Sequence, residues 1–234
     1  MMDLSPQDAR NAILDAALVS AVFDGWTDQM IEASAQSAGL PKGSAALYFP
    51  DGVLEVITYW SERMDAAVEP AIQALDHETM KIRDRITQSV ILRLHELDPH
   101  IDAARRAQAR LSLPDGLATA AKIGWAASDM IWTAIGDKSD DLNYYSKRTI
   151  LSAVMASTAA VWLNDTSPDK SEARAFLDRR IANVMQFETA KARARQITDV
   201  LPNPLNVLRQ LGQRSDVNGT PTRRRKRAIR RGRG

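Results

Sequence analysis

The residues able to perform acid–base, nucleophilic or metal chemistry are few and scattered along the chain. The 234 residues include no cysteine and three histidines, His77, His95 and His100. His95-Glu96 begins like a zinc-protease motif, but the next histidine is His100, after Pro99, so the two rings cannot share a helix face at i and i+4. No phosphate-binding glycine loop and no nucleophile elbow is present. We therefore expect no catalytic residue, no metal site and no cofactor. An enzyme whose site is assembled from residues distant in sequence stays an alternative.

The elements that would position such residues are helices. Between prolines and glycines the apolar residues recur with a helical period, and no alternating run of β-branched residues predicts a strand. Thr27, Asp51 and Asp98 stand where N-caps are expected. The predicted helices cover residues 6–25, 27–39, 41–48, 51 to about 70, 82–97, 98 onward, 113–136, 139 or 140 onward, and 167 onward. The predicted fold class is all-α.

Two of these helices are apolar on nearly every side. Residues 117–135 carry only Lys122 and Asp129 as charged groups, and residues 151–163 carry none. A helix of this kind is buried, either at the centre of a bundle or beside an apolar cavity, and periodicity does not separate the two readings. For the cavity reading, the predicted lipid-facing residues are Met130, Trp132, Leu151, Val154, Met155, Val161 and Trp162.

The first 52 residues resemble the helix-turn-helix of the TetR regulator family. The matching positions are the opening AILDAAL, Gly25, the AxxAGL segment at 35–40, Lys42-Gly43 and Tyr48-Phe49. Ala46 and Gly52 depart from the pattern, standing where a tyrosine and a lysine usually contact DNA. Residues 1–60 carry a net charge of −6. Because duplex affinity depends on neutralising phosphates, we expect no specific DNA binding. A regulator that senses a small apolar ligand remains the alternative.

The second half of the chain resembles a narrower family. The strings GDKSDDLNYYSKRTILSAV at 136–154, NDTSPD at 164–169 and AFLDRRIANVM at 175–185, with GWTDQMIEASAQSAGL at 25–40, are similar to the TetR-like lipid-binding protein family of coenzyme Q (ubiquinone) biosynthesis. The resemblance covers about residues 8–213.

This resemblance implies a non-enzymatic homodimer on a membrane. Such a protein holds an isoprenoid quinone precursor or a phospholipid in a ligand cavity. It presents the lipid to the di-iron hydroxylase that acts on demethoxyubiquinone. Because water solvates a prenyl chain poorly, we expect the cavity to take the prenyl tail. The implied partner surface comprises Trp132, Asp141, Asn143, Tyr144, Tyr145 and Arg148, with Ile131 and Ala134 as positions that depart from the family. Exposed tyrosines beside an arginine also fit the composition of interface hot spots, although Tyr145 packed in the core is the alternative.

The C-terminal segment fits a membrane role. After Pro202-Asn203-Pro204, the predicted helix of residues 200–213 places apolar side chains on one side, and its membrane-binding residues are Leu201, Leu205, Leu208, Arg209 and Leu211. Residues 214–234 carry nine basic and one acidic side chain, a net charge of +8, whereas the preceding 213 residues carry −6. Such a tail is disordered by composition and favours anionic partners, or it is only solvated. A helix that folds back onto the body, or onto a second subunit, is the alternative to a membrane helix.

These readings divide the chain into four parts. We expect a degenerate helix-turn-helix domain at 1–52, a helical ligand-binding and dimerisation domain at 53–190, an amphipathic membrane helix at 200–213 and a basic tail at 214–234. The N-terminus MMDLSPQDAR lacks the features of a secretory or transit peptide. The expected location is cytoplasmic, peripheral to the inner face of the membrane, or the mitochondrial matrix side if a transit peptide has been removed.

Overall fold

The computed structural model describes residues 4–76, 78–140 and 142–200, with side chains described through residue 186. Throughout these residues the secondary structure is helical, without a strand, which confirms the predicted all-α class. The helices are α1 (Pro6–Asp24), α2 (Asp28–Ser37), α3 (Ser44–Tyr48), α4 (Val53–Gln73), α5 (Ile82–His95), α6 (Ile101–Leu111), α7 (Leu117–Ala134), α8 (Leu142–Asn164) and α9 (Ser171–Val200), with 3₁₀ turns η1 (Asp98–His100) and η2 (Pro168–Lys170).

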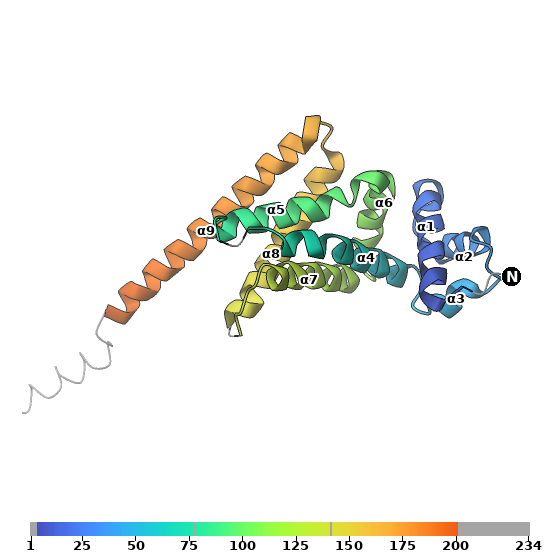
Figure 1. Cartoon of the computed structure of the whole chain (residues 1–234), viewed down its shortest axis with the longest axis horizontal. Coiled ribbons are helices and arrows are strands. Elements are labelled where there is room, and N and C mark those ends of the chain that lie inside the picture. Colours follow the sequence, from blue (N-terminus) through green and yellow to red (C-terminus); the bar gives the residue numbers. More distant parts are fainter. Residues whose placement is uncertain (1–3, 77, 141, 201–234) are drawn as a thin grey trace, which may run out of the picture. The chain divides into compact units, whose positions relative to one another are not determined.

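Helices α1 to α3 form the helix-turn-helix arrangement that the sequence predicted (Figure 1). α1 ends at Gly25, whose φ of 69° is readily adopted by glycine. The Thr27 hydroxyl then caps α2 by accepting a hydrogen bond from the Met30 amide. Between the two helices, Trp26 points inward, where its Nε1 donates to the Ala103 carbonyl of α6 at 2.9 Å and its ring stacks on Trp60 of α4. This tryptophan ties the N-terminal helices to the rest of the body.

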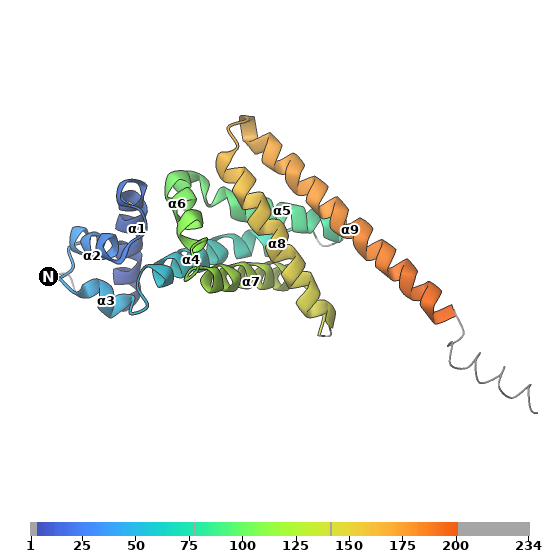
Figure 2. The ribbon, with the colours of Figure 1, turned by 180° about the vertical axis from the view of Figure 1, so that it is seen from behind.

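Helices α4 to α8 form the body of the molecule (Figures 1 and 2). α4 contacts α5 on one side and α7 on another, and α7 packs along α8. α6 lies between these helices and α1 and contacts both α7 and α8. Five helices thus converge around one region of the core, which is where the cavity described below lies.

Two predicted N-caps have other roles. Asp51 does not cap α4, because the Val53 amide donates instead to Asp28 Oδ1 from α2 at 2.8 Å. Asp98 lies within η1, and its Oδ1 accepts a hydrogen bond from Trp162 Nε1 of α8 at 2.8 Å. In both cases a contact from a distant part of the chain, which single-helix patterns do not encode, decides the role. Pro70 also falls inside α4, where it neither ends the helix nor prevents its last turn.

The chain divides into two compact units at Met185. The first contains α1 to α8 and the start of α9, which packs on the body through Ala173, Leu177 and Ile181. The predicted domain 1–52 and residues 53–185 of the predicted domain 53–190 therefore lie in this one unit. The predicted membrane helix and basic tail, including Leu201, Leu205, Leu208, Arg209 and Leu211, lie outside the described residues. Among the helices that are described, none has the length and apolar character needed to cross a bilayer.

Candidate functional site

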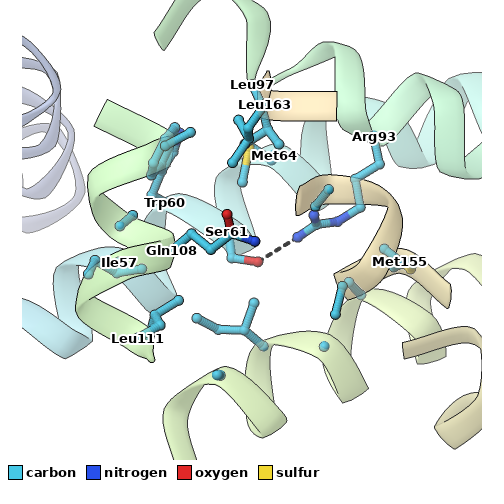
Figure 3. Close-up of a pocket in the computed structure, with 18 of the residues that line it drawn as sticks. Ile57, Trp60, Ser61, Met64, Arg93, Leu97, Gln108, Leu111, Met155 and Leu163 are labelled. Carbon is cyan, nitrogen blue, oxygen red and sulfur yellow. Dashed lines mark hydrogen bonds between the residues drawn. The ribbon is translucent and has the colours of Figure 1, made fainter. Parts of the chain in front are cut away.

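An apolar cavity of about 340 Å³ lies where α4 to α8 converge (Figure 3). Its volume is near the lower end of the range of roughly 300–1,000 Å³ that is usual for small-ligand sites. The lining residues are Ile57, Trp60, Ser61, Met64, Arg93, Leu94, Leu97, Ala104, Ala107, Gln108, Leu111, Ser112, Leu117, Ala120, Ile123, Gly124, Ala127, Ser152, Met155, Ala156, Ala159 and Leu163. The alanines and Gly124 leave the volume open beside larger side chains such as Trp60.

One wall of the cavity carries a buried ion pair. Arg93 of α5 is 7% exposed, and its Nε donates to Asp65 Oδ1 of α4 at 2.6 Å. Its Nη2 donates to the Ser61 hydroxyl at 2.6 Å, the bond drawn in Figure 3. Burial raises the pKa of Asp65 above its ordinary value, and the neighbouring Arg93 charge opposes this rise. The pair therefore presents a guanidinium surface without net charge to the cavity.

The cavity opens where its lining residues are exposed. Gln108 of α6, Ser112, Leu117 at the start of α7 and Ala156 of α8 are all exposed lining residues. Of these, Leu117 is 58% exposed. An exposed apolar side chain thus borders the mouth, as is expected where an apolar ligand enters or leaves.

The structure places one of the seven predicted lipid-facing residues, Met155, in the lining of this cavity. Trp132, Leu151, Val154 and Trp162 are buried in the core, and Met130 and Val161 are partly buried beside it. These six do not line the cavity and stay predictions for any other lipid contact. Sequence reasoning missed the lining from α4, α5 and α6, including Arg93 and Ser61, because only α7 and α8 are apolar on all sides.

A cluster of three aromatic rings lies at the junction of α7 and α8. Tyr144 and Tyr145 meet edge to face with ring centres 5.2 Å apart, and Trp125 lies 6.3 Å and 6.1 Å from them. Tyr145 is 61% exposed and Tyr144 is partly buried, so Tyr145 does not pack in the core. An exposed ring supported by two partly buried rings in this way suits a protein contact surface.

Arg148 lies beneath this cluster and is nearly inaccessible. Its guanidinium packs against the Tyr144 ring, its Nε donates to Asp129 Oδ1, and its Nη1 lies 3.5 Å from Asp137 Oδ2. Asp137 also accepts from Lys147 at 2.7 Å. Burial alone would raise the pKa of Asp137, but hydrogen bonds from Lys147 and Ser139 outweigh it and lower that pKa. This ionic network holds the first turns of α8 against α7.

The predicted partner surface is therefore divided between exposed and buried residues. Asn143 and Tyr145 are exposed, whereas Arg148 and Trp132 are buried. Ile131 is fully buried in the core, so it forms no part of the surface of this unit, contrary to expectation. It lies on the side of α7 that faces the other helices, a placement that its family position did not reveal. Asp141 lies outside the described residues.

The helix-turn-helix face carries one exposed basic residue near its reading helix α3, Lys42, which precedes the helix by two residues. Arg10, one of two basic residues in the first 60, packs on the rings of Phe49 and Tyr59 and pairs with Glu55 at 3.2 Å. At the start of α3, Glu32 Oε1 accepts a hydrogen bond from the Gly43 amide at 2.7 Å. That bond is the main reason that the pKa of Glu32 is lowered. The backbone amide at the start of α3 is therefore occupied by a carboxylate of α2.

The histidines do not form a metal centre in the part of the chain that the structure describes. His95 Nδ1 pairs with Asp98 Oδ2, and its Nε2 lies 2.9 Å from Arg174 Nη2. The ring of His100 packs edge-on against Trp60. Both rings thus serve contacts between helices. His77 lies outside the described residues.

Comparison with solved structures identifies the fold. The TetR transcriptional regulator from Nitrosomonas europaea aligns with a TM-score of 0.58 and 18% sequence identity, over 74% of this chain and 95% of that one. A putative TetR-family regulator from Rhodococcus sp. aligns with a TM-score of 0.51, also at 18% identity, over 76% of this chain and 99% of that one. The TetR-like fold predicted from the N-terminal motifs is confirmed, and at this identity the likeness concerns the fold alone.

Comparison with protein families points to one family. Residues 117–188 match the family described as COQ9. The ubiquinone biosynthesis protein COQ9, mitochondrial, of Rattus norvegicus is 31% identical over 194 residues, which are 80% of this chain and 62% of that protein. The protein of the same name from Homo sapiens is 31% identical over 80% of this chain and 61% of its own length. The chain thus spans about three fifths of the length of these curated relatives.

The matched region includes α7, α8 and the first part of α9, and with them the aromatic cluster and one side of the cavity. The motifs at 136–154 and 164–169 that first indicated the family lie inside it. Residues 117–188 thus match the COQ9 family within a TetR-like fold, as the sequence motifs indicated.

Proposed function

We propose that this chain is a lipid-binding accessory protein of ubiquinone biosynthesis. It holds an isoprenoid quinone intermediate and presents it to the di-iron demethoxyubiquinone hydroxylase at a membrane surface. The observation that carries the proposal is the apolar cavity of about 340 Å³ inside a unit that includes the COQ9-family region. The rat and human relatives are ubiquinone biosynthesis proteins by name.

The mechanism that we propose is binding rather than catalysis. An isoprenoid group is poorly solvated by water, and its transfer into an apolar cavity is favourable by about 25 cal/mol for each Å² of apolar surface removed from water. A cavity of this volume encloses a molecule of drug-like size, so a long prenyl chain fits only in part. The remainder must lie along the protein surface or in the bilayer.

The partner surface that we propose is centred on Tyr145, with Tyr144 and Trp125 beside it. These rings form the exposed aromatic cluster on α7 and α8, and aromatic side chains are enriched among the residues that dominate binding energy at interfaces. We also propose that the chain forms a homodimer and that residues 200–213, with the basic tail at 214–234, hold it on anionic lipid. Flotation with phosphatidylserine vesicles, with and without residues 200–234, tests the membrane part: loss of flotation on truncation supports it, and unchanged flotation removes it.

A direct test of the main proposal is extraction of the purified protein with organic solvent, followed by mass spectrometry. Protein made in a quinone-producing host should yield prenylated quinones or their precursors in amounts comparable to the protein. An extract without any lipid would contradict the proposal. A reference protein without a cavity, purified from the same host, controls for lipid carried through purification.

A transcriptional regulator that senses an apolar ligand is the second candidate, and the TetR-like fold favours it. The charges of the N-terminal helices oppose it, because Glu32 occupies the Gly43 amide and Arg10 is paired internally. An electrophoretic shift at moderate salt separates the two functions. Sequence-specific DNA binding that is lost on deletion of residues 1–52 would favour the regulator.

A further inference from the structure

The cavity has hydrogen-bond donors that the protein itself leaves unused. A guanidinium group has five N–H donors. Arg93 uses Nε for Asp65 and Nη2 for Ser61, and Nη1 has no hydrogen-bond partner among the described residues. Arg93 also lines the cavity in Figure 3. Nη1 is not fully buried, so an oxygen atom of a ligand in the cavity beside Arg93 can accept a hydrogen bond from it.

The net charge of the Arg93–Asp65 pair determines whether an anionic or an uncharged oxygen of a ligand is favoured beside it. Asp65 neutralises Arg93 at 2.6 Å, so the pair offers donors but no net positive charge. A carboxylate or phosphate brought into the cavity would be a buried anion without a counter-ion of its own. The raised pKa of Asp65 agrees with this, since it reflects a site that disfavours negative charge. An uncharged acceptor, such as a quinone or ester carbonyl, fits the wall without this penalty.

The size of the cavity and the nature of its mouth indicate how the ligand lies. A volume of about 340 Å³ suits a substituted ring with a short stretch of chain and does not suit a complete polyprenyl tail. Leu117, which is 58% exposed, lines the cavity at its mouth. An apolar chain that leaves the cavity would therefore meet an apolar side chain there.

From these observations we infer that Arg93 binds an uncharged carbonyl oxygen of the ligand, so that the oxygenated ring lies inside the cavity and the prenyl chain leaves past Leu117. This inference rests on the proposed function, in which the cavity binds an isoprenoid lipid. It reverses the tail-first orientation that we expected from the poor solvation of a prenyl chain by water. Transfer to a partner then requires release of the carbonyl from Arg93.

The test compares three probes that share a ten-carbon chain: a decyl-substituted benzoquinone, decylbenzene and decanoate. Affinities for the full chain are measured by isothermal titration calorimetry. We expect the wild type to prefer the quinone. In Asp65→Asn/Arg93→Met, which removes both charges together, the quinone should bind roughly 10- to 100-fold more weakly, as expected for loss of a hydrogen bond to a charged donor, while decylbenzene affinity stays unchanged. In Asp65→Asn alone, the uncompensated guanidinium should increase the affinity for decanoate.

The matched control is Arg10→Met/Glu55→Gln, which removes a comparable ion pair away from the cavity and should leave all three affinities unchanged. If the cavity variant does not fold, Arg93→Lys keeps the charge pair without Nη1 and should still weaken quinone binding. Equal loss of quinone and decylbenzene, or unchanged quinone affinity, overturns the inference but leaves the proposed function standing. A wild type that binds none of the probes and yields no lipid on extraction contradicts both.

Discussion

The guanidinium carbon of Arg148 lies 3.4 Å from the centre of the Tyr144 ring. This contact joins a buried ionic network to an exposed aromatic cluster, because Arg148 also binds Asp129 while Tyr144 contacts Tyr145. The buried arginine therefore positions the rings, and the rings form the surface. Stability and partner binding should consequently respond to different residues of this one cluster.

Replacement of Tyr145 by alanine should weaken partner binding without unfolding the protein. Tyr145 is 61% exposed, so we expect the free energy of unfolding to change by less than about 0.5 kcal/mol. Loss of an aromatic hot spot typically costs about 2 kcal/mol of binding free energy, or roughly a 30-fold increase in Kd for the hydroxylase. Val19→Ala, at an equally exposed apolar position on α1, is the control. Equal affinities for the two variants, measured by surface plasmon resonance, would place the partner surface elsewhere.

Replacement of Arg148 by methionine should instead destabilise the fold. The change leaves Asp129 and Asp137 without their guanidinium partner. Breaking a fully buried ion pair costs about 3–5 kcal/mol, and the partial exposure of Asp129 reduces the expected loss to about 2–3 kcal/mol. Urea unfolding monitored by circular dichroism measures this difference. A loss as small as that of Tyr145→Ala would show that the network adds no stability.

A bulky side chain at the mouth of the cavity should reduce lipid binding. Ala156 of α8 is an exposed lining residue, so phenylalanine there would narrow the opening without overpacking the core. Ala153 lies on the same helix, is also exposed, and does not line the cavity, which makes Ala153→Phe a matched control. We expect the extract of Ala156→Phe to contain several-fold less lipid per protein than that of Ala153→Phe. Equal amounts would exclude this opening as the route.

The stability should decrease in acid through Asp137. Hydrogen bonds from Lys147 and Ser139 outweigh the effect of burial and lower its pKa. The ionised form of Asp137 is therefore more stable in the folded protein than in the unfolded chain. This stabilisation is present above the ordinary aspartate pKa of about 3.8 and is lost as the pH falls through the lowered value. Asp65 acts in the opposite direction because burial raises its pKa. Asp137→Asn should therefore flatten the acid side of the stability curve, measured by urea unfolding between pH 2.5 and 6.

Any affinity for DNA should come from the C-terminal tail rather than from the helix-turn-helix. Residues 214–234 carry +8, whereas residues 1–60 carry −6. We expect weak binding that decreases steeply with salt and shows no sequence preference. Removal of residues 214–234 should abolish the electrophoretic shift, and removal of 1–52 should not. A shift that survives the first deletion would contradict this expectation.

Local signals in the sequence predicted the helices well and their partners poorly. The positions of Gly25 and Thr27 mark the end of α1 and the start of α2 because each acts within its own turn. Asp51 and Asp98 have the same local appearance as caps, yet Asp28 and Trp162 decide the outcome from distant parts of the chain. A pattern within one helix contains no information about which helix lies beside it.

The lining of the cavity was likewise predictable only where the signal lies within one helix. The apolar helices α7 and α8 were predicted as its source, and Met155 does line it. Arg93 was not predicted because an arginine on an amphipathic helix usually faces water. It is placed inside by Asp65 and Ser61 on α4, some 30 residues earlier in the chain. Recognition of such a site from sequence requires knowledge of which helices pair.

The hydrogen bond from the Gly43 amide to Glu32 has a consequence for any attempt to engineer DNA binding into this fold. Added lysines would correct the net charge of the N-terminal helices. The Gly43 amide would still donate its hydrogen bond to Glu32 of α2 and would not be free to bind a phosphate. The Gly43 amide is thus already occupied by a carboxylate of the same chain. Restoring an operator-binding module would require Glu32 to be removed first, and only then the surface to be recharged.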